Sequence, residues 1–203
     1  MFSRLAEEVS SFNTRRKGDA WMQPYIAPVD GDPGQPFILV ILTDLMKRCH
    51  SLQQAGELVY IDATAGLYAL NTPLTIISTN TPIGGLPLAT ILTSDETTIT
   101  LTKALNMLKH IMPSTAFGGC GALVGPQVIM TDDSSAERKA LQCTWKKATL
   151  LLCVFHFLQA INETILEATY MKLTTSQIYL KYSHFQRHFR ATWDRHKEWA
   201  IAF

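Results

Sequence analysis

The chain has 203 residues, of which 47% are hydrophobic and 17% are charged, and its net charge is +1. This balance is typical of one folded globular domain and excludes a largely disordered chain. The charge is divided unevenly, because residues 1–100 hold 6 Lys/Arg against 10 Asp/Glu and residues 101–203 hold 12 against 7. A basic second half suits a polyanionic partner, but scattered solvated charges would give the same counts.

The four cysteines, Cys49, Cys120, Cys143 and Cys153, contain no Cys-x-x-Cys pair. We expect reduced thiols in an intracellular protein and no disulfide framework. The N-terminal segment lacks the apolar stretch of a secretory signal. The longest apolar runs, PFILVIL and LLLCVF, are far shorter than the roughly 20 residues that a bilayer span needs. The sequence therefore predicts a soluble protein without a membrane partner.

The first 36 residues are predicted to form a helix followed by an arm. Leu5, Val9 and Phe12 recur at spacings of four and three, which indicates a short helix over residues 1–12. Between Trp21 and Pro36, prolines and glycines are too dense for a regular element, so this stretch is predicted to be a linker or an extended arm. Residues 37–52 change from apolar to amphipathic, which predicts a second helix.

The next elements predict an α/β fold. Three short β-rich runs indicate an antiparallel meander, and they are followed by alternating helices and strands in the order β-β-β-α-β-α-β-α. This order is that of a ribonuclease H-like mixed five-stranded sheet. The strands are expected over residues 57–63, 73–79, 86–94, 126–132 and 149–155, and the helices between them over 97–111 and 134–144. We assign residues 37–160 to this core and residues 161–203 to a C-terminal helical insertion.

Two of the predicted strands end in aspartate, Asp62 in VYID and Asp132 in VIMTD. The first and fourth strands are neighbours in this fold, so both carboxylates would lie near the same cations. Phosphodiester chemistry by two divalent ions needs such hard oxygen ligands. Asp133 would point to the opposite face, and we interpret it as a partner of the next helix N-terminus. An aspartate at a strand end is also a common turn former or helix cap.

Residues 58–160 resemble the transposase domain of Mutator-like elements. YIDATAGLY carries the first aspartate of that family, VIMTDDSSAERKAL the second, and LLLCVFHFLQA a Cys-x-x-His motif. Weaker similarity extends through AWMQPY and WDRHKEWAIAF. The resemblance implies a nuclear enzyme that uses two Mg²⁺ or Mn²⁺ ions to cut and join DNA at terminal inverted repeats. Asp62 and Asp132 would be catalytic metal ligands, and His156 would act beside them.

In this family the third catalytic acid is a glutamate after a helical insertion. The chain ends at Phe203, directly after the segment that precedes this glutamate, so we expect the third acid to be absent. Glu198 is the last candidate, and Glu163 and Glu167 are alternatives that equally fit a solvated helix face. The isolated chain is therefore expected not to cleave DNA. A decayed or domesticated DNA- or protein-binding domain is the alternative, and another ribonuclease H-like nuclease, such as an integrase, is a third.

The last part of the chain has two further features. Cys153 and His156 could form half of a zinc site, or a buried cysteine and a histidine at a helix start. An aromatic stripe at helical spacing predicts core packing of the insertion, and a basic face opposite it predicts contacts with DNA phosphates, although a solvated face would look the same. The stripe consists of Ile178, Tyr182, Phe185, Phe189 and Trp193, and the basic face of Lys181, Arg187, Arg190 and Arg195. A second copy of the chain is a further candidate partner.

Overall fold

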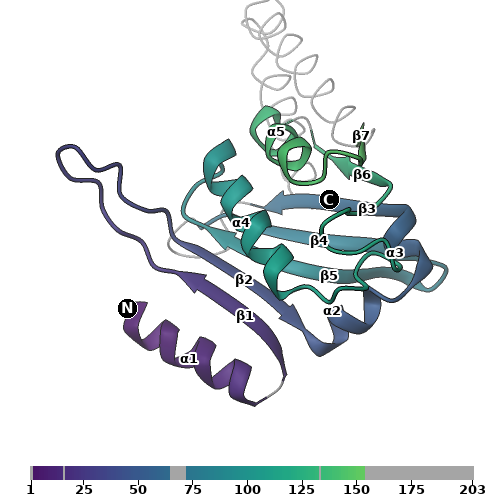
Figure 1. The fold of residues 1–203 in the computed structure, drawn as a ribbon, viewed down its shortest axis with the longest axis horizontal. Coiled ribbons are helices and arrows are strands. Elements are labelled where there is room, and N and C mark those ends of the chain that lie inside the picture. The colour runs from purple at the N-terminus through teal and green to yellow at the C-terminus, as the bar shows by residue number, and fades with distance from the viewer. Residues whose placement is uncertain (1, 16, 65–71, 133, 154–203) are drawn as a thin grey trace, which may run out of the picture. The chain divides into compact units, whose positions relative to one another are not determined.

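The computed structural model describes residues 2–15, 17–64, 72–132 and 134–153, all within one compact unit. These residues form a mixed α/β fold with a seven-stranded sheet and five helices (Figure 1). The helices are α1 (Phe2–Thr14), α2 (Asp44–Cys49), α3 (Gln53–Glu57), α4 (Thr98–Ile111) and α5 (Ser135–Thr144). The strands are β1 (Gly18–Gln23), β2 (Ile38–Thr43), β3 (Leu58–Thr64), β4 (Leu74–Thr81), β5 (Gly84–Thr93), β6 (Val128–Thr131) and β7 (Thr149–Leu152).

The strands lie in the order β1-β2-β5-β4-β3-β6-β7. β3, β4 and β5 form an antiparallel meander, and β6 and β7 run parallel to β3. The predicted α/β class is confirmed, and the succession of three strands, helix, strand, helix and strand is present from β3 to β7. The helix expected after β7 and the insertion over residues 161–203 lie outside the described residues.

Two predictions for the first part of the chain are wrong. The sheet has seven strands where five were expected, and residues 37–52 form β2 and then α2 where one helix was expected. The physical reason is pairing on both sides, because β2 bonds to β1 and to β5. Val40 and Leu42 are thereby fully buried, and the Thr43 side chain accepts a bond from Met46 N to begin α2.

The N-terminal helix is observed as α1, and the segment rich in proline and glycine is an extended arm (Figure 1). β1 overlaps the start of the stretch that was assigned to this arm, at residues 21–23, and it joins the sheet as its edge strand. The remaining arm residues double back as a narrow ribbon. Its isolated bridges pair Ile26 with Gln35 and Val29 with Asp32.

The core fills one face of the sheet, under α4 and α5. Alternate residues of the strands point into it, such as Val59 and Ile61 of β3, which are buried. The other face of β2 carries Leu39 and Ile41 toward α1. In the part of the chain that the structure describes, no helix is both long and apolar enough to cross a bilayer.

Candidate functional site: carboxyl groups at the ends of three strands

Asp62 and Asp132 come from neighbouring parallel strands. The register pairs Leu58 with Val128 and Tyr60 with Met130, so continuing it by two residues sets Asp62 beside Asp132. Asp62 is exposed near the end of β3, and Asp132 is partly exposed immediately after β6. The structure therefore brings the two predicted aspartates together at one edge of the sheet.

The turn that follows Asp132 fixes its side chain. Asp132 Oδ1 accepts a hydrogen bond of 2.8 Å from Ser134 N, and the Ser134 hydroxyl caps α5 by accepting from Glu137 N at 3.3 Å. Asp132 thus forms the turn, which was one of its two expected roles. The turn also holds the carboxylate at the edge where Asp62 lies, so the structural role does not compete with a ligand role.

Glu137 is a third carboxyl group at this place, and the sequence did not point to it. Its residue is only 5% exposed, and its Oε1 accepts a hydrogen bond from the hydroxyl of Thr131, which is also buried. Burial raises the pKa of Glu137 to about 8, with further increases from the negative charges of Asp132, Asp62 and Glu96. Glu137 therefore holds its proton at neutral pH.

One sequence signal for Glu137 existed. Ser134 and Glu137 have the spacing of a capping box, which predicts a glutamate that turns back to the helix N-terminus. The structure keeps the first half of this motif, because Ser134 accepts from Glu137 N. The glutamate side chain instead turns into the core toward Thr131. The pattern gives the residue but not the direction of its side chain.

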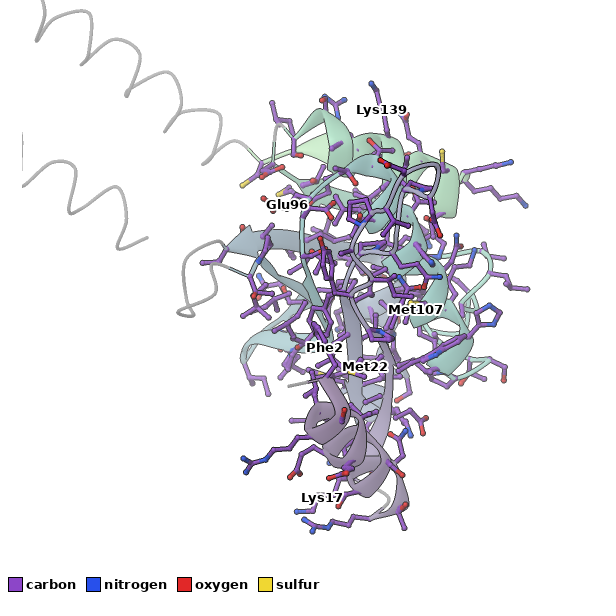
Figure 2. All side chains as sticks on the ribbon, turned by 90° about the vertical axis from the view of Figure 1, so that its left-hand side faces the viewer. Phe2, Lys17, Met22, Glu96, Met107 and Lys139 are labelled. Carbon is purple, nitrogen blue, oxygen red and sulfur yellow. The ribbon has the colours of Figure 1, made fainter. Side chains whose placement is uncertain are left out.

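Glu96 is the fourth carboxyl group whose charge acts on Glu137. It lies between β5 and α4, after Asp95, which accepts a bond from Thr97 N at 3.0 Å. β5 runs in the same direction as β3, because each is antiparallel to β4, so the loop after β5 lies at the same edge as Asp62. We call Asp62, Glu96, Asp132 and Glu137 the carboxyl cluster. Figure 2 labels Glu96 on the opposite side of the molecule from Lys17.

The carboxyl cluster is not a preassembled cation cage. Among the described residues, no three His, Cys, Asp or Glu side chains lie close enough together to hold a metal ion. Asp62 and Asp132 supply oxygen donors of the kind that Mg²⁺ and Mn²⁺ prefer. Glu137 is protonated and bound to Thr131, so it would have to lose its proton to join them. The residues therefore fit a site in which two aspartates hold the cation.

Cys153 continues the line of β7 beside the cluster, since its backbone N–H donates to Thr131 O at 2.8 Å. Its thiol is free and half-buried. The other predicted site residues lie outside the described residues, so their placement remains a prediction. They are Asp133, His156, Glu163, Glu167, Glu198, Lys181, Arg187, Arg190 and Arg195, together with the aromatic stripe.

Comparison of the chain with protein-family models and with curated proteins gives no match. The resemblance to Mutator-like transposases therefore stays a prediction from the motifs themselves. The geometry of the carboxyl cluster is the observation on which a functional proposal can be built.

Proposed function

We propose that this chain is a fragment of a DNA transposase catalytic domain with a ribonuclease H-like fold. Asp62 and Asp132 would hold Mg²⁺ or Mn²⁺ for DNA strand cleavage and transfer at terminal inverted repeats, in the nucleus. One observation carries this proposal: the parallel register of β3 and β6, when it is continued by two residues beyond Tyr60 and Met130, puts Asp62 beside Asp132 where the two strands end.

The arrangement of the strands supports the fold part of the proposal. Within the sheet, the order β5-β4-β3-β6-β7 has β3, the first strand of the meander, in the middle. The other two meander strands, β4 and β5, lie on one side of it, and β6 and β7 lie on the other. β4 alone among these five runs opposite to the rest. β1 and β2 are then additions beyond β5.

The surroundings of the aspartates support the chemical part. Ser134 N orients Asp132, and the proton on Glu137 removes one negative charge from beside the two aspartates. If these aspartates held a divalent cation, it would supply charge neutralisation at a phosphate and activation of the attacking oxygen. Asp62 and Asp132 are the residues that would touch the ion.

A second candidate function is DNA or protein binding without catalysis. The observation that favours it is Glu137: the nearest third carboxyl group is protonated and engaged with Thr131, so it offers no charged ligand. Two carboxylates hold a second metal ion poorly. The chain would then keep the fold and the partner while lacking the reaction.

Binding of a labelled DNA duplex to the full chain, with and without Mn²⁺, tests the proposal. We expect Mn²⁺ to raise the affinity of the chain for DNA. In the Asp62→Asn and Asp132→Asn variants, this increase in affinity should be smaller by a factor of at least about 10. Glu7→Gln is the matched control, because Glu7 is an exposed carboxylate on α1, which contacts β1 at the far edge of the sheet. Binding that ignores Mn²⁺, or a gain that both aspartate variants retain, would contradict the proposal.

Nicking of supercoiled DNA would decide in favour of the catalytic candidate. If the chain nicks DNA in Mn²⁺ and Asp62→Asn abolishes this activity, the catalytic function is correct. Because the third acid is expected to be absent from this chain, binding that Mn²⁺ strengthens without any strand being cut agrees with both candidates.

A further inference from the structure

The arm between β1 and β2 is an ordered ribbon that projects from the sheet (Figure 1). Ile26 and Gln35 exchange two backbone hydrogen bonds of 2.9 Å, and Val29 and Asp32 exchange bonds of 3.0 and 2.8 Å. Gln23 Nε2 also donates to Pro36 O at 2.7 Å and closes the base of the arm. The arm is therefore preorganised, and it would lose little conformational entropy on binding a partner.

The arm exposes large apolar side chains next to acidic ones. Tyr25, Ile26 and Val29 are 47%, 48% and 67% exposed. Asp30 and Asp32 lie exposed at the tip, and residues 24–36 contain no Lys, Arg or His. Several large apolar side chains left exposed on one segment of a folded protein mark an interaction surface. A complementary partner surface should be apolar along its length and carry basic side chains at the end that meets the acidic tip of the arm.

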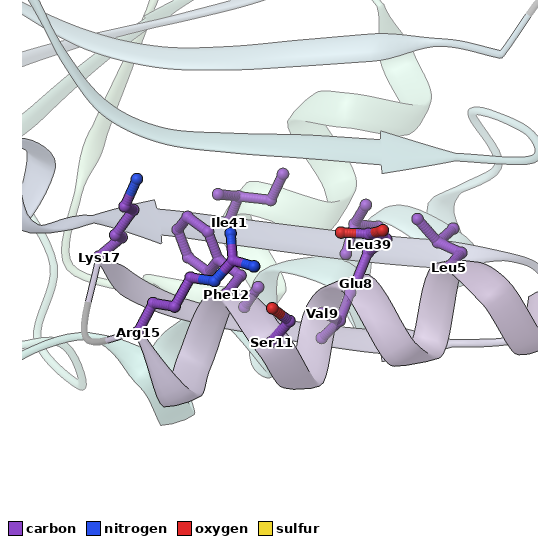
Figure 3. A pocket seen from close by; sticks show the side chains of 10 residues that line it. Leu5, Glu8, Val9, Ser11, Phe12, Arg15, Lys17, Leu39 and Ile41 are labelled. Carbon is purple, nitrogen blue, oxygen red and sulfur yellow. The ribbon is translucent and has the colours of Figure 1, made fainter.

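This chain carries such a surface. An open groove of about 340 Å³ runs between α1 and the β1–β2 pair (Figure 3). Its walls are mainly apolar, formed by Leu5, Val9, Phe12, Ala20, Leu39 and Ile41. Arg15 and Lys17 lie together at one end, while Glu8 lies further along toward Leu5 (Figure 3). The groove thus has an apolar floor and a basic end.

The basic end of the groove is the end away from the arm. The Phe2 ring contacts the Phe37 ring at 5.4 Å, which fixes the start of α1 at the base of the arm. At the other end, Lys17 O accepts from Asp44 N at 3.0 Å, just after β2 ends. Figure 2 accordingly shows Phe2 near Met22, the last-but-one residue of β1, and Lys17 at the far end of α1. An arm cannot reach the basic end of its own groove.

The lengths match for a second copy. Six residues of extended chain lead from Pro24 to Val29, and β1 also has six residues. Both therefore span about 20 Å. If a two-fold axis passes near the arm base, the arm of one copy runs along the groove of the other. Its acidic tip then arrives at the basic end of that groove.

We infer that two copies of this chain form a dimer by exchanging arms, so that the arm of each copy lies in the groove of the other. Asp30 and Asp32 pair with Arg15 and Lys17 across the interface. The exchange is reciprocal, so each copy gives one arm and receives one, as a two-fold interface requires. This interface is independent of the carboxyl cluster.

Sedimentation velocity of the full chain at micromolar concentrations tests the dimer. We expect twice the mass of one chain, and a dimer dissociation constant at least about 10-fold higher for Val29→Asp. Ile83→Asp is the matched control, because Ile83 is 89% exposed in the β4–β5 turn and should leave the dimer intact. A monomeric wild type, or a Val29→Asp variant that dimerises normally, would overturn the inference.

Charge reversal tests the pairing more sharply. Variant one carries Arg15→Glu and Lys17→Glu, and variant two carries Asp30→Lys and Asp32→Asn. The Asp32→Asn change keeps a side-chain oxygen for the Gly34 N–H that Asp32 now binds at 2.9 Å. Each variant alone should be monomeric, whereas a mixture should form a heterodimer, since both arm and groove pairs are then complementary. A mixture that stays monomeric, or variants that dimerise alone, would show that the arms do not lie in these grooves.

Discussion

The hydroxyl of Thr131 donates a hydrogen bond to the carboxyl group of Glu137 inside the core, one residue before Asp132. This bond turns a helix glutamate inward, away from solvent. It also holds Glu137, which is protonated at neutral pH, close to the two aspartates at the ends of β3 and β6. The candidate site therefore combines exposed charge with a buried proton.

The buried proton predicts an unusual pH dependence of stability. The folded-state pKa of Glu137 is about 8, against an ordinary value of 4.5, so the folded chain keeps a proton that the unfolded chain releases in this range. The free energy of unfolding should therefore fall as pH rises from 4.5 to 8 and level off above 8. Glu137→Gln cannot ionise and keeps an oxygen acceptor for Thr131. Urea unfolding at pH 6.5, 7 and 8 should show a smaller loss of stability with rising pH for this variant than for the wild type, and equal losses would contradict a raised pKa of Glu137.

His50 should have the opposite effect at acidic pH. Its ring is fully buried, its Nδ1 accepts a hydrogen bond from Phe117 N at 3.4 Å, and burial lowers its pKa to about 4. The folded chain thus binds fewer protons than the unfolded chain, and stability should fall as pH drops from 6.5 to 4.

His50→Gln should remove this acid-dependent loss while lowering stability at pH 7 by about 1–3 kcal/mol, because a packed ring is lost. Urea unfolding at pH 7 and pH 5 measures both effects. His110→Gln is the control, since His110 is exposed, with its ring 5.6 Å from that of Trp21. A His50→Gln variant that loses as much stability as the wild type on acidification would contradict a neutral buried His50.

Two glycines in the loop before β6, Gly125 and Gly119, should differ in how well they tolerate a side chain. Gly125 has φ +83, and a Cβ there would lie 2.4 Å from Trp145 Cδ1, whose ring is buried. Gly119 has φ +92 and open space around it. Thermal unfolding should show a loss of about 3 kcal/mol for Gly125→Ala and about 1 kcal/mol for Gly119→Ala, since only the first combines a clash with backbone strain. Equal losses would mean that Trp145 moves aside freely.

The sequence predicted the strands whose apolar runs are clear or end in an aspartate. It missed the elements that are strands only because they pair with a neighbouring strand. β3 and β6 were found because apolar runs end at Asp62 and Asp132. β1 was missed because GDAWMQ has no clear β pattern, and it is a strand through its six register pairs with β2. β2 was mistaken for helix because its apolar run continues into α2 at helical spacing.

Half of the carboxyl cluster, the two aspartates, could be predicted from the sequence, and the two glutamates could not. The register of two neighbouring strands determines that Asp62 and Asp132 meet, and strand order in a known fold predicts such neighbours. Glu96 and Glu137 could not be recognised in the same way. Their place in the carboxyl cluster depends on how α4 and α5 begin and on a side-chain bond to Thr131, which are tertiary features.

Direct Mn²⁺ binding is the measurement that tests the central claim most closely. The loss of the free Mn²⁺ paramagnetic resonance signal on titration with the full chain gives the affinity without any DNA. We predict that the wild type and Glu7→Gln bind Mn²⁺ alike, and that the double variant Asp62→Asn/Asp132→Asn binds at least about 10-fold more weakly. Equal Mn²⁺ affinity in the wild type and the double variant would contradict the claim that these two aspartates form a cation site.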